Sequence, residues 1–240
     1  MEQQGNLISV DLPSRNLVYS VEAGSIKIRT LRGKDEKLIS EITLDNFEKK
    51  FLTVFQNIVT GIDPTELTVG DRLFILVWEA INSYNKEYPI QYLCSSCLNN
   101  VRAIVDLSKL ELVQLPEEFK EPYPMKLSNN ETVMLRLLRV KDEIAIADYE
   151  RSNKESWLFK YAMTIVDEQK NIIEKMKYLE DLPAGDLARI RSFEQEYAHG
   201  PKMEQTCTCP RCGAKEDVAC PFRLEMLFPY GKELKRYFRN

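Results

Sequence analysis

Residues 28–36 of the chain read Ile-Arg-Thr-Leu-Arg-Gly-Lys-Asp-Glu, and residues 135–143 read Leu-Arg-Leu-Leu-Arg-Val-Lys-Asp-Glu. Each stretch predicts a strand that leads into a helix, because carboxylates in a first helical turn suit the positive end of the helix dipole. The second stretch begins 107 positions after the first (135 − 28). Self-similarity at a fixed offset is the signature of an internal repeat.

Further landmarks recur in the same order. The same offset carries an apolar stripe onto an apolar stripe: Phe51, Val54, Ile58 and Val59 onto Leu158, Tyr161, Ile165 and Val166. An offset of 115 (182 − 67) carries a second group of landmarks: Leu67, Gly70, Asp71, Cys94 and Cys97 onto Leu182, Gly185, Asp186, Cys209 and Cys212. An insertion of eight residues (115 − 107) within 167–181 reconciles the two offsets. The sequence therefore predicts a tandem duplication.

Each copy is predicted to be one α+β unit made of a hairpin, helices and a cysteine knuckle. The first hairpin is expected to pair residues 17–19 with 26–31, and the second to pair 125–127 with 133–138. The intervening segments contain Gly or Asn, as tight turns require. The fold class expected from this plan is α+β, with the two knuckles joining the copies.

Three helices are expected in each copy. One starts at the Lys-Asp-Glu step, a second carries the stripe that begins at Phe51 or Leu158, and a third starts at Asp71 or Asp186. The adjacent carboxylates of the Lys-Asp-Glu steps could be imagined as catalytic pairs. Adjacent residues on a helix point in different directions, however, and a role at the helix start explains both copies.

The predicted domain boundary is a proline-rich segment. Residues 114–124 contain three prolines and four charged residues, a composition that disfavours a helix or a central strand. The chain is therefore divided into a first repeat with its knuckle (1–113), an extended connector (114–124), and a second repeat with its knuckle and a basic tail (125–240).

The cysteines carry the clearest chemical signal. Cys94-Ser-Ser-Cys97 and Cys209-Pro-Arg-Cys212 are two Cys-x-x-Cys knuckles, the arrangement that closes a structural zinc site with four sulfur ligands. Because 111 residues (98–208) separate the knuckles, a Zn²⁺ ion held by all four would join the end of one copy to the end of the other.

The cysteines also allow other interpretations. Cys207 could substitute for Cys209 as a ligand, and Cys220 falls in the strand after the knuckle and is expected in the core. The knuckles could instead be decayed, with free thiols packed as small apolar groups. A redox dithiol lacks the βαβ context of thioredoxins. The single histidine, His199, is expected at a helix end rather than on the metal.

Composition excludes several classes of protein. The net charge of −4 argues against a general nucleic-acid binder, and the basic residues 232–239 read as a solvated helix end rather than as a docking tail. The first five residues show no signal peptide, and the longest apolar run, 73–78, is too short to span a membrane. The sequence also has no phosphate loop, nucleophile elbow or His-Glu-x-x-His helix, so no enzyme is predicted.

Several motifs in one order resemble the T-even-type bacteriophage baseplate protein family over about residues 10–145. They are Leu-Pro-Ser-Arg-Asn at 12–16 with Tyr19, 28–31 leading into 34–36, Asp63-Pro64 followed by 67–72, Tyr-Leu-Cys-Ser-Ser-Cys at 92–97, and 105–107 leading to 115–117. Two departures are Asn16 where the family prefers Gly, and the absence of Pro from the first knuckle.

The resemblance implies a component or assembly factor of the baseplate hub in a contractile tail. Such a protein would bind other hub or tail proteins, without a small-molecule substrate or a membrane, in the host cytoplasm during assembly or in the virion. The alternative function is a zinc-ribbon nucleic-acid adaptor or regulator, which the acidic balance of the chain disfavours. A thiol-disulfide enzyme is a third hypothesis.

Overall fold

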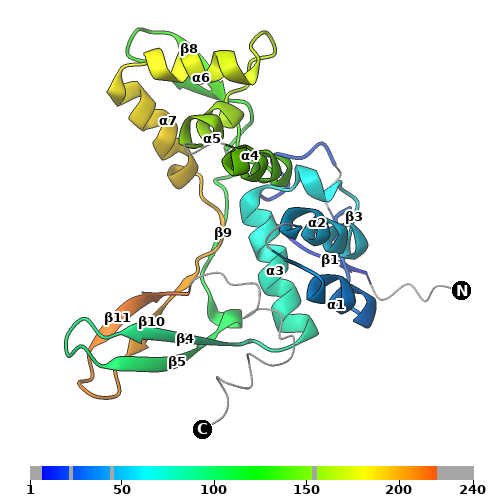
Figure 1. Ribbon diagram of the computed structural model, residues 1–240, viewed down its shortest axis with the longest axis vertical. Helices are drawn as coiled ribbons and strands as arrows, with labels where there is room; N and C mark the ends of the chain where they lie inside the picture. The colour runs from blue at the N-terminus through cyan, green and yellow to red at the C-terminus, as the bar shows by residue number, and fades with distance from the viewer. Residues whose placement is uncertain (1–6, 22–23, 44–45, 153–155, 221–240) are drawn as a thin grey trace, which may run out of the picture.

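The computed structural model describes residues 7–21, 24–43, 46–152 and 156–220, and these form three lobes (Figure 1). The first lobe contains β1 Ile8–Ser9, β2 Lys27–Ile28, β3 Val59–Thr60, α1 Gly33–Ser40, α2 Phe47–Ile58, the short 3-10 turn η1 Pro64–Glu66, and α3 Val69–Ser83. The second lobe contains β7 Tyr123–Lys126, β8 Thr132–Leu135, α5 Trp157–Thr164, α6 Ile172–Asp181 and α7 Ala184–Glu196, with α4 Val140–Ser152 between the two lobes.

The third lobe consists of two antiparallel hairpins that lie side by side. They are β4 Glu87–Leu93 with β5 Asn100–Asp106, and β10 Glu204–Thr208 with β11 Lys215–Ala219. A short ladder of β6 Leu112–Val113 with β9 Gly200–Pro201, and the turn η2 Leu107–Lys109, complete the described elements. Helices and small sheets together agree with the predicted α+β class.

The first predicted hairpin is wrong. Residues 13–18 form successive turns, in which Arg15 and Asn16 have φ angles of 54° and 58° that a strand does not allow. Strand β2 pairs instead with β1 on one side and β3 on the other, so Ile28 lies between Ile8 and Val59. Both partners come from outside the local hairpin that turn residues had suggested.

The second predicted hairpin is confirmed in β7–β8. Tyr123 pairs with Leu135 and Lys126 with Thr132, and Asn130 adopts the positive φ (69°) that its turn requires. Both strands end earlier than predicted, because the chain after Leu135 leaves the ladder to approach α4.

Helices α3 and α7 each begin two residues before the predicted start. As a result Asp71 and Asp186 occupy the third helical position, and each is buried. Asp71 accepts the backbone N–H of Ser14 at 2.9 Å, and Asp186 accepts that of Ser128 at 3.0 Å. The two halves therefore fasten a preceding turn to a helix start in the same way.

A second contact also recurs in both halves. Arg29 donates two hydrogen bonds to Asp35 (2.8 and 3.2 Å), and Arg136 donates two to Asp142 (2.6 and 2.8 Å). Each aspartate also accepts a backbone N–H at the start of its helix, at 2.9 Å from Arg32 and 2.7 Å from Arg139. The prediction that these carboxylates serve helix starts is confirmed.

The third lobe takes one hairpin from each half of the chain. Cys207, Val218 and Cys220, from β10–β11 and the residue after it, pack in the same apolar core as α3 and β4–β5. The connector 114–124 forms no helix, and it inserts Leu115 and Phe119 into the core of the second lobe. The two knuckles are thus brought together by side-chain packing between their hairpins, as well as by backbone pairing of the segments that adjoin them.

None of the helices in the described ranges has both the length and the apolar character that crossing a bilayer requires. The basic segment 232–239 and the first five residues lie outside the described part of the chain.

Candidate metal centre and the junction between the halves

Four cysteine sulfurs gather at the distal end of the two hairpins. Cys94 and Cys97 follow β4, Cys209 and Cys212 follow β10, and all four Sγ atoms lie within 4.8 Å of one another. The Sγ atoms of Cys94 and Cys212 are 3.7 Å apart, as are those of Cys97 and Cys209. These are the four residues singled out in the sequence.

This geometry fits a tetrahedral metal ion. Four sulfurs at about 2.3 Å from a zinc ion stand about 3.8 Å from one another, close to the two separations observed. The cluster could therefore hold a metal ion with all four positions filled by protein, the closed form of structural rather than catalytic sites.

The pKa values of Cys209 and Cys94 are shifted in opposite directions within the cluster. Backbone N–H groups of Cys212 and Arg211 lower the pKa of Cys209 to about 7. The N–H of Cys97 lowers the pKa of Cys94, but burial and the neighbouring thiols outweigh it and raise that pKa to about 12. Cys209 is thus favoured as a thiolate, whereas a bound cation would be needed to favour the thiolate form of Cys94.

The two knuckles have the same backbone geometry. Leu98 donates its N–H to the carbonyl of Cys94 at 2.9 Å, and Gly213 donates to that of Cys209 at 2.9 Å. Both residues after the second cysteine have positive φ, 55° at Leu98 and 75° at Gly213. A further bond joins the knuckles, because Glu216 on β11 accepts the backbone N–H of Ser95 at 3.2 Å.

The remaining predicted candidates lie elsewhere. Cys207 is buried within β10 and paired with Glu216, and it is not part of the four-sulfur cluster. Cys220 is buried in the core, as expected. His199 lies just after α7 and is not among the grouped metal-ligating residues of the described chain.

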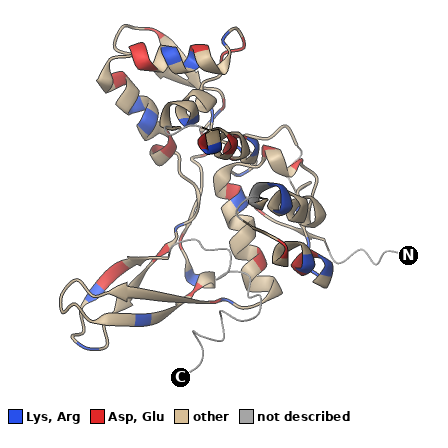
Figure 2. Ribbon diagram, in the orientation of Figure 1, with Lys and Arg blue, Asp and Glu red and all other residues tan. Residues whose placement is uncertain are grey.

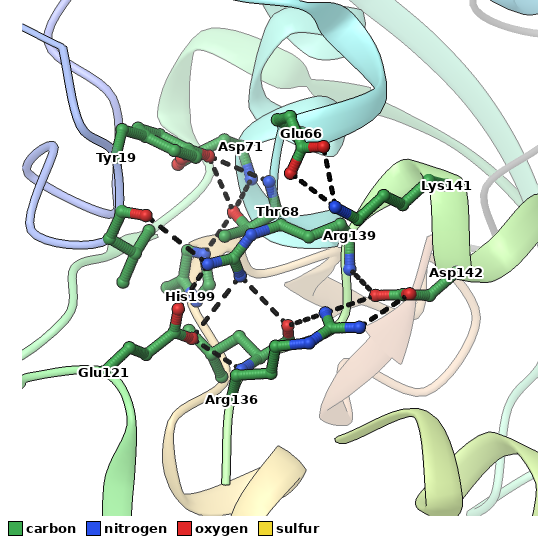
Figure 3. Close-up of polar contacts among 12 residues, drawn as sticks. Tyr19, Glu66, Thr68, Asp71, Glu121, Arg136, Arg139, Lys141, Asp142 and His199 are labelled. Atoms are coloured by element: carbon green, nitrogen blue, oxygen red, sulfur yellow. Dashed lines mark hydrogen bonds and ion pairs between the residues drawn. The ribbon is translucent and has the colours of Figure 1, made fainter. Parts of the chain in front are cut away.

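His199 instead belongs to a polar junction between the two halves (Figure 3). Its Nδ1 lies 3.0 Å from the carbonyl oxygen of Tyr197, which can only accept, so Nδ1 carries the proton in the neutral ring. Its Nε2 lies 2.7 Å from the hydroxyl of Thr68 and accepts from it. A residue just after α7 is thereby bonded to the residue that caps α3.

Tyr19 extends this junction into the first lobe. Its hydroxyl donates to Asp71 at 2.5 Å and accepts the backbone N–H of Thr68 at 2.8 Å. Burial, reinforced by the Asp71 carboxylate, raises the pKa of Tyr19 well above its usual value. The phenol therefore stays neutral and serves at a fixed position as both a hydrogen-bond donor and an acceptor.

Arg139 supplies the cation of the junction. It is buried, pairs with Glu121 of the connector and donates to the carbonyl oxygens of Leu137 (3.0 Å) and Val18 (3.4 Å). An isolated antiparallel bridge between Thr68 and Arg139 runs beside these contacts. The chain entering α3 and the chain entering α4 are thus paired through both backbone and side chains (Figure 3).

Sequence reasoning did not single out this junction. The Thr68-x-x-Asp71 spacing is a capping-box pattern, and it would have identified the start of α3. No local signal in the sequence indicates that Tyr19 and His199 converge on that cap from distant parts of the chain.

The fold and the cluster define an α+β protein whose two halves meet at four cysteines able to hold one metal ion. A sequence model of the family described as T4 bacteriophage base plate protein matches residues 8–228. The chain belongs to this family. Comparison of the chain with curated proteins and with solved structures gave no match.

Proposed function

We propose that the protein is a structural or assembly component of the baseplate hub of a contractile phage tail, acting by binding other tail proteins and not by catalysis. The observation that carries this proposal is the match to the baseplate family over residues 8–228. The site supports it, because a closed four-cysteine cluster has no position left for a substrate.

The metal in this proposal is Zn²⁺, held by Cys94, Cys97, Cys209 and Cys212. Sulfur-only ligation and near-tetrahedral separations favour zinc among the common cellular metals. The ion would act as a brace, tying the hairpin of residues 87–106 to that of residues 204–219. A reducing compartment such as the host cytoplasm would keep the thiols available for it.

The two halves also share an origin in this proposal. The recurring Arg–Asp pairs at Arg29–Asp35 and Arg136–Asp142 support a tandem duplication, as do the equivalent knuckles. Helix α6 occupies 172–181, inside the stretch where the two offsets require an insertion. The division into repeats 1–113 and 125–240 follows from the same argument, with the hairpin of each repeat contributing to one shared lobe.

The hub role is tested by quantitative mass spectrometry of purified particles and of infected-cell lysate, with a null allele of the gene in parallel. A fixed low copy number in particles indicates a resident hub component. Presence in lysate alone, together with failed baseplates in the null allele, indicates an assembly factor that departs. Normal baseplates in the null allele would contradict both forms of the proposal.

A further inference from the structure

Leu98 adopts a backbone conformation that suits glycine. Its φ is 55°, and the equivalent residue of the second knuckle is Gly213, with φ 75°. Glycine reaches this left-handed region freely, whereas a bulky side chain there is strained. The knuckle turn imposes this conformation, since Leu98 donates its N–H to the Cys94 carbonyl at 2.9 Å, but Leu98 is 71% exposed, so a leucine in place of glycine gains nothing from burial within the chain. Strained residues of this kind concentrate where a protein binds something.

Leu98 adjoins an exposed apolar face on the β4–β5 hairpin. Leu93 and Ile104 are 61% and 58% exposed, and Arg102 is exposed between them in register. Leu93 pairs with Asn100, and Arg102 and Ile104 follow Asn100 at two-residue steps, so all these side chains share one face. We call Leu93, Leu98, Arg102 and Ile104 the knuckle patch.

The β10–β11 hairpin, which carries the second knuckle, can be compared with this face position by position. Its matching outer positions carry Thr206, Thr208, Lys215 and Asp217, which are polar or charged, and the small residue Ala219 where the first hairpin has Ile104. The Thr206 hydroxyl donates to Asp217 at 2.6 Å, so this surface is satisfied by itself and by water. A hairpin that carries a knuckle in this protein therefore does not need leucine and isoleucine on its outer face.

Charge identifies the chemistry of the occupant. Arg102 has no ion pair with a carboxylate of the described residues, and its cross-strand neighbour is the neutral Gln91. The other cations near the cluster in sequence, Arg211 and Lys215, belong to the second knuckle and the strand that follows it. Figure 2 shows basic segments on both hairpins toward their knuckle ends. Arginine amid exposed apolar side chains is typical of protein interfaces.

We propose that the knuckle patch is a docking surface for another baseplate protein, one that offers an apolar recess bordered by a carboxylate opposite Arg102. This inference rests on the proposed hub function and adds the surface through which it is exercised. The cysteine cluster then has a second consequence, since it fixes the turn that holds Leu98 outward.

The contact is tested first by photo-crosslinking in infected cells. A photoreactive phenylalanine analogue is placed in the full-length chain at position 93, 98 or 104, and at 206 or 208 as controls. The expected result is that the three patch positions crosslink to one and the same baseplate protein, at a segment containing Asp or Glu, and that the controls do not. Crosslinks to nucleic acid, to a second copy of this chain, or to no partner would overturn the proposal.

Binding to the partner identified in this way is then measured with purified proteins. Leu98→Gly is expected to weaken binding roughly tenfold or more, the loss that follows from removing one buried leucine side chain from an interface. The same variant should keep its metal and its melting temperature or raise the latter, because glycine relieves the backbone strain. Arg102→Glu should weaken binding as well, and Thr208→Ala should leave it unchanged.

Two outcomes separate this inference from the proposed function. If the null allele prevents baseplate assembly while Leu98→Gly and Arg102→Glu phages assemble normally, the docking surface is refuted and the hub role stands. If the null allele leaves baseplates intact, the hub role itself fails. Unchanged affinity of a well-folded Leu98→Gly variant would equally refute the docking surface.

Discussion

Gly70→Ala tests how closely the two halves are packed. Gly70 is the second residue of α3 and lies against β9, which follows His199. A Cβ atom at position 70 would lie 2.3 Å from the carbonyl oxygen of His199 and 2.9 Å from its carbonyl carbon. The approach is reciprocal, because a Cβ at Gly200 would lie 2.7 Å from the carbonyl oxygen of Gly70. Both neighbours are backbone atoms, so alanine must separate α3 from β9.

The expected loss of stability can be worked from these contacts. Non-bonded carbon atoms pack best at roughly 3.5–4.0 Å, so the overlap exceeds about 1 Å, and overpacking of this kind costs about 1–3 kcal/mol. Loss of the Thr68–His199 hydrogen bond adds about 0.5–1.5 kcal/mol. The preference of helices for alanine offsets up to about 1 kcal/mol. We expect Gly70→Ala to lower the free energy of unfolding by about 2 kcal/mol.

Gly185→Ala is the matched control. Gly185 occupies the second position of α7, as Gly70 does in α3, but a Cβ there meets nothing within 4 Å. Helix propensity therefore acts alike on both variants, and their difference reports the close approach. Urea unfolding followed by circular dichroism gives that difference, and hydrogen exchange at β9 shows whether the junction has opened. Equal stabilities, within about 0.5 kcal/mol, would refute the packing described here.

Three further predictions concern the cluster, a buried carboxyl and the junction. Cys97→Ser should lose bound metal and lower the melting temperature, whereas Cys207→Ser should keep its metal, as measured by elemental analysis and calorimetry. Burial raises the pKa of Glu79 to about 7, so the folded state binds a proton that the unfolded state has released. The contribution of Glu79 to stability is thus fully present below about pH 4.5 and lost as the pH rises through 7. Glu79→Gln should flatten the fall in unfolding free energy between those pH values, and an unaltered pH profile would count against this assignment. Tyr19→Phe should cost about 1–3 kcal/mol in urea unfolding, because it removes the phenol donor to Oδ2 of the buried Asp71 and the acceptor of the Thr68 N–H, and a loss near zero would show that the junction is not tightly packed.

The helix starts and the knuckles could be predicted from the sequence because their signals are local. Cys-x-x-Cys spacing reports one turn, and the Lys-Asp-Glu steps report helix starts that Asp35 and Asp142 do occupy. The strand partners, in contrast, could not be predicted from local signals. The pairing of Ile28 with both Ile8 and Val59 depends on how distant segments pack, and no periodicity in residues 26–31 encodes it.

The junction was missed for the same reason. Thr68 and Asp71 are recognisable as a helix cap, but Tyr19 and His199 reach that cap only in the folded chain. Leu98 shows another limit of sequence reasoning. Its strain becomes visible only when the φ angle is known and compared with that of Gly213.

The central claim is that one metal ion, held by cysteines from both halves of the chain, joins the two halves. Native mass spectrometry of the full-length protein, purified without chelator, tests it most directly. The account predicts one Zn²⁺ per chain, lost alike when Cys94 of the first knuckle or Cys212 of the second is replaced by serine. A wild-type protein without stoichiometric metal, or one that keeps its zinc after either replacement, would contradict the claim.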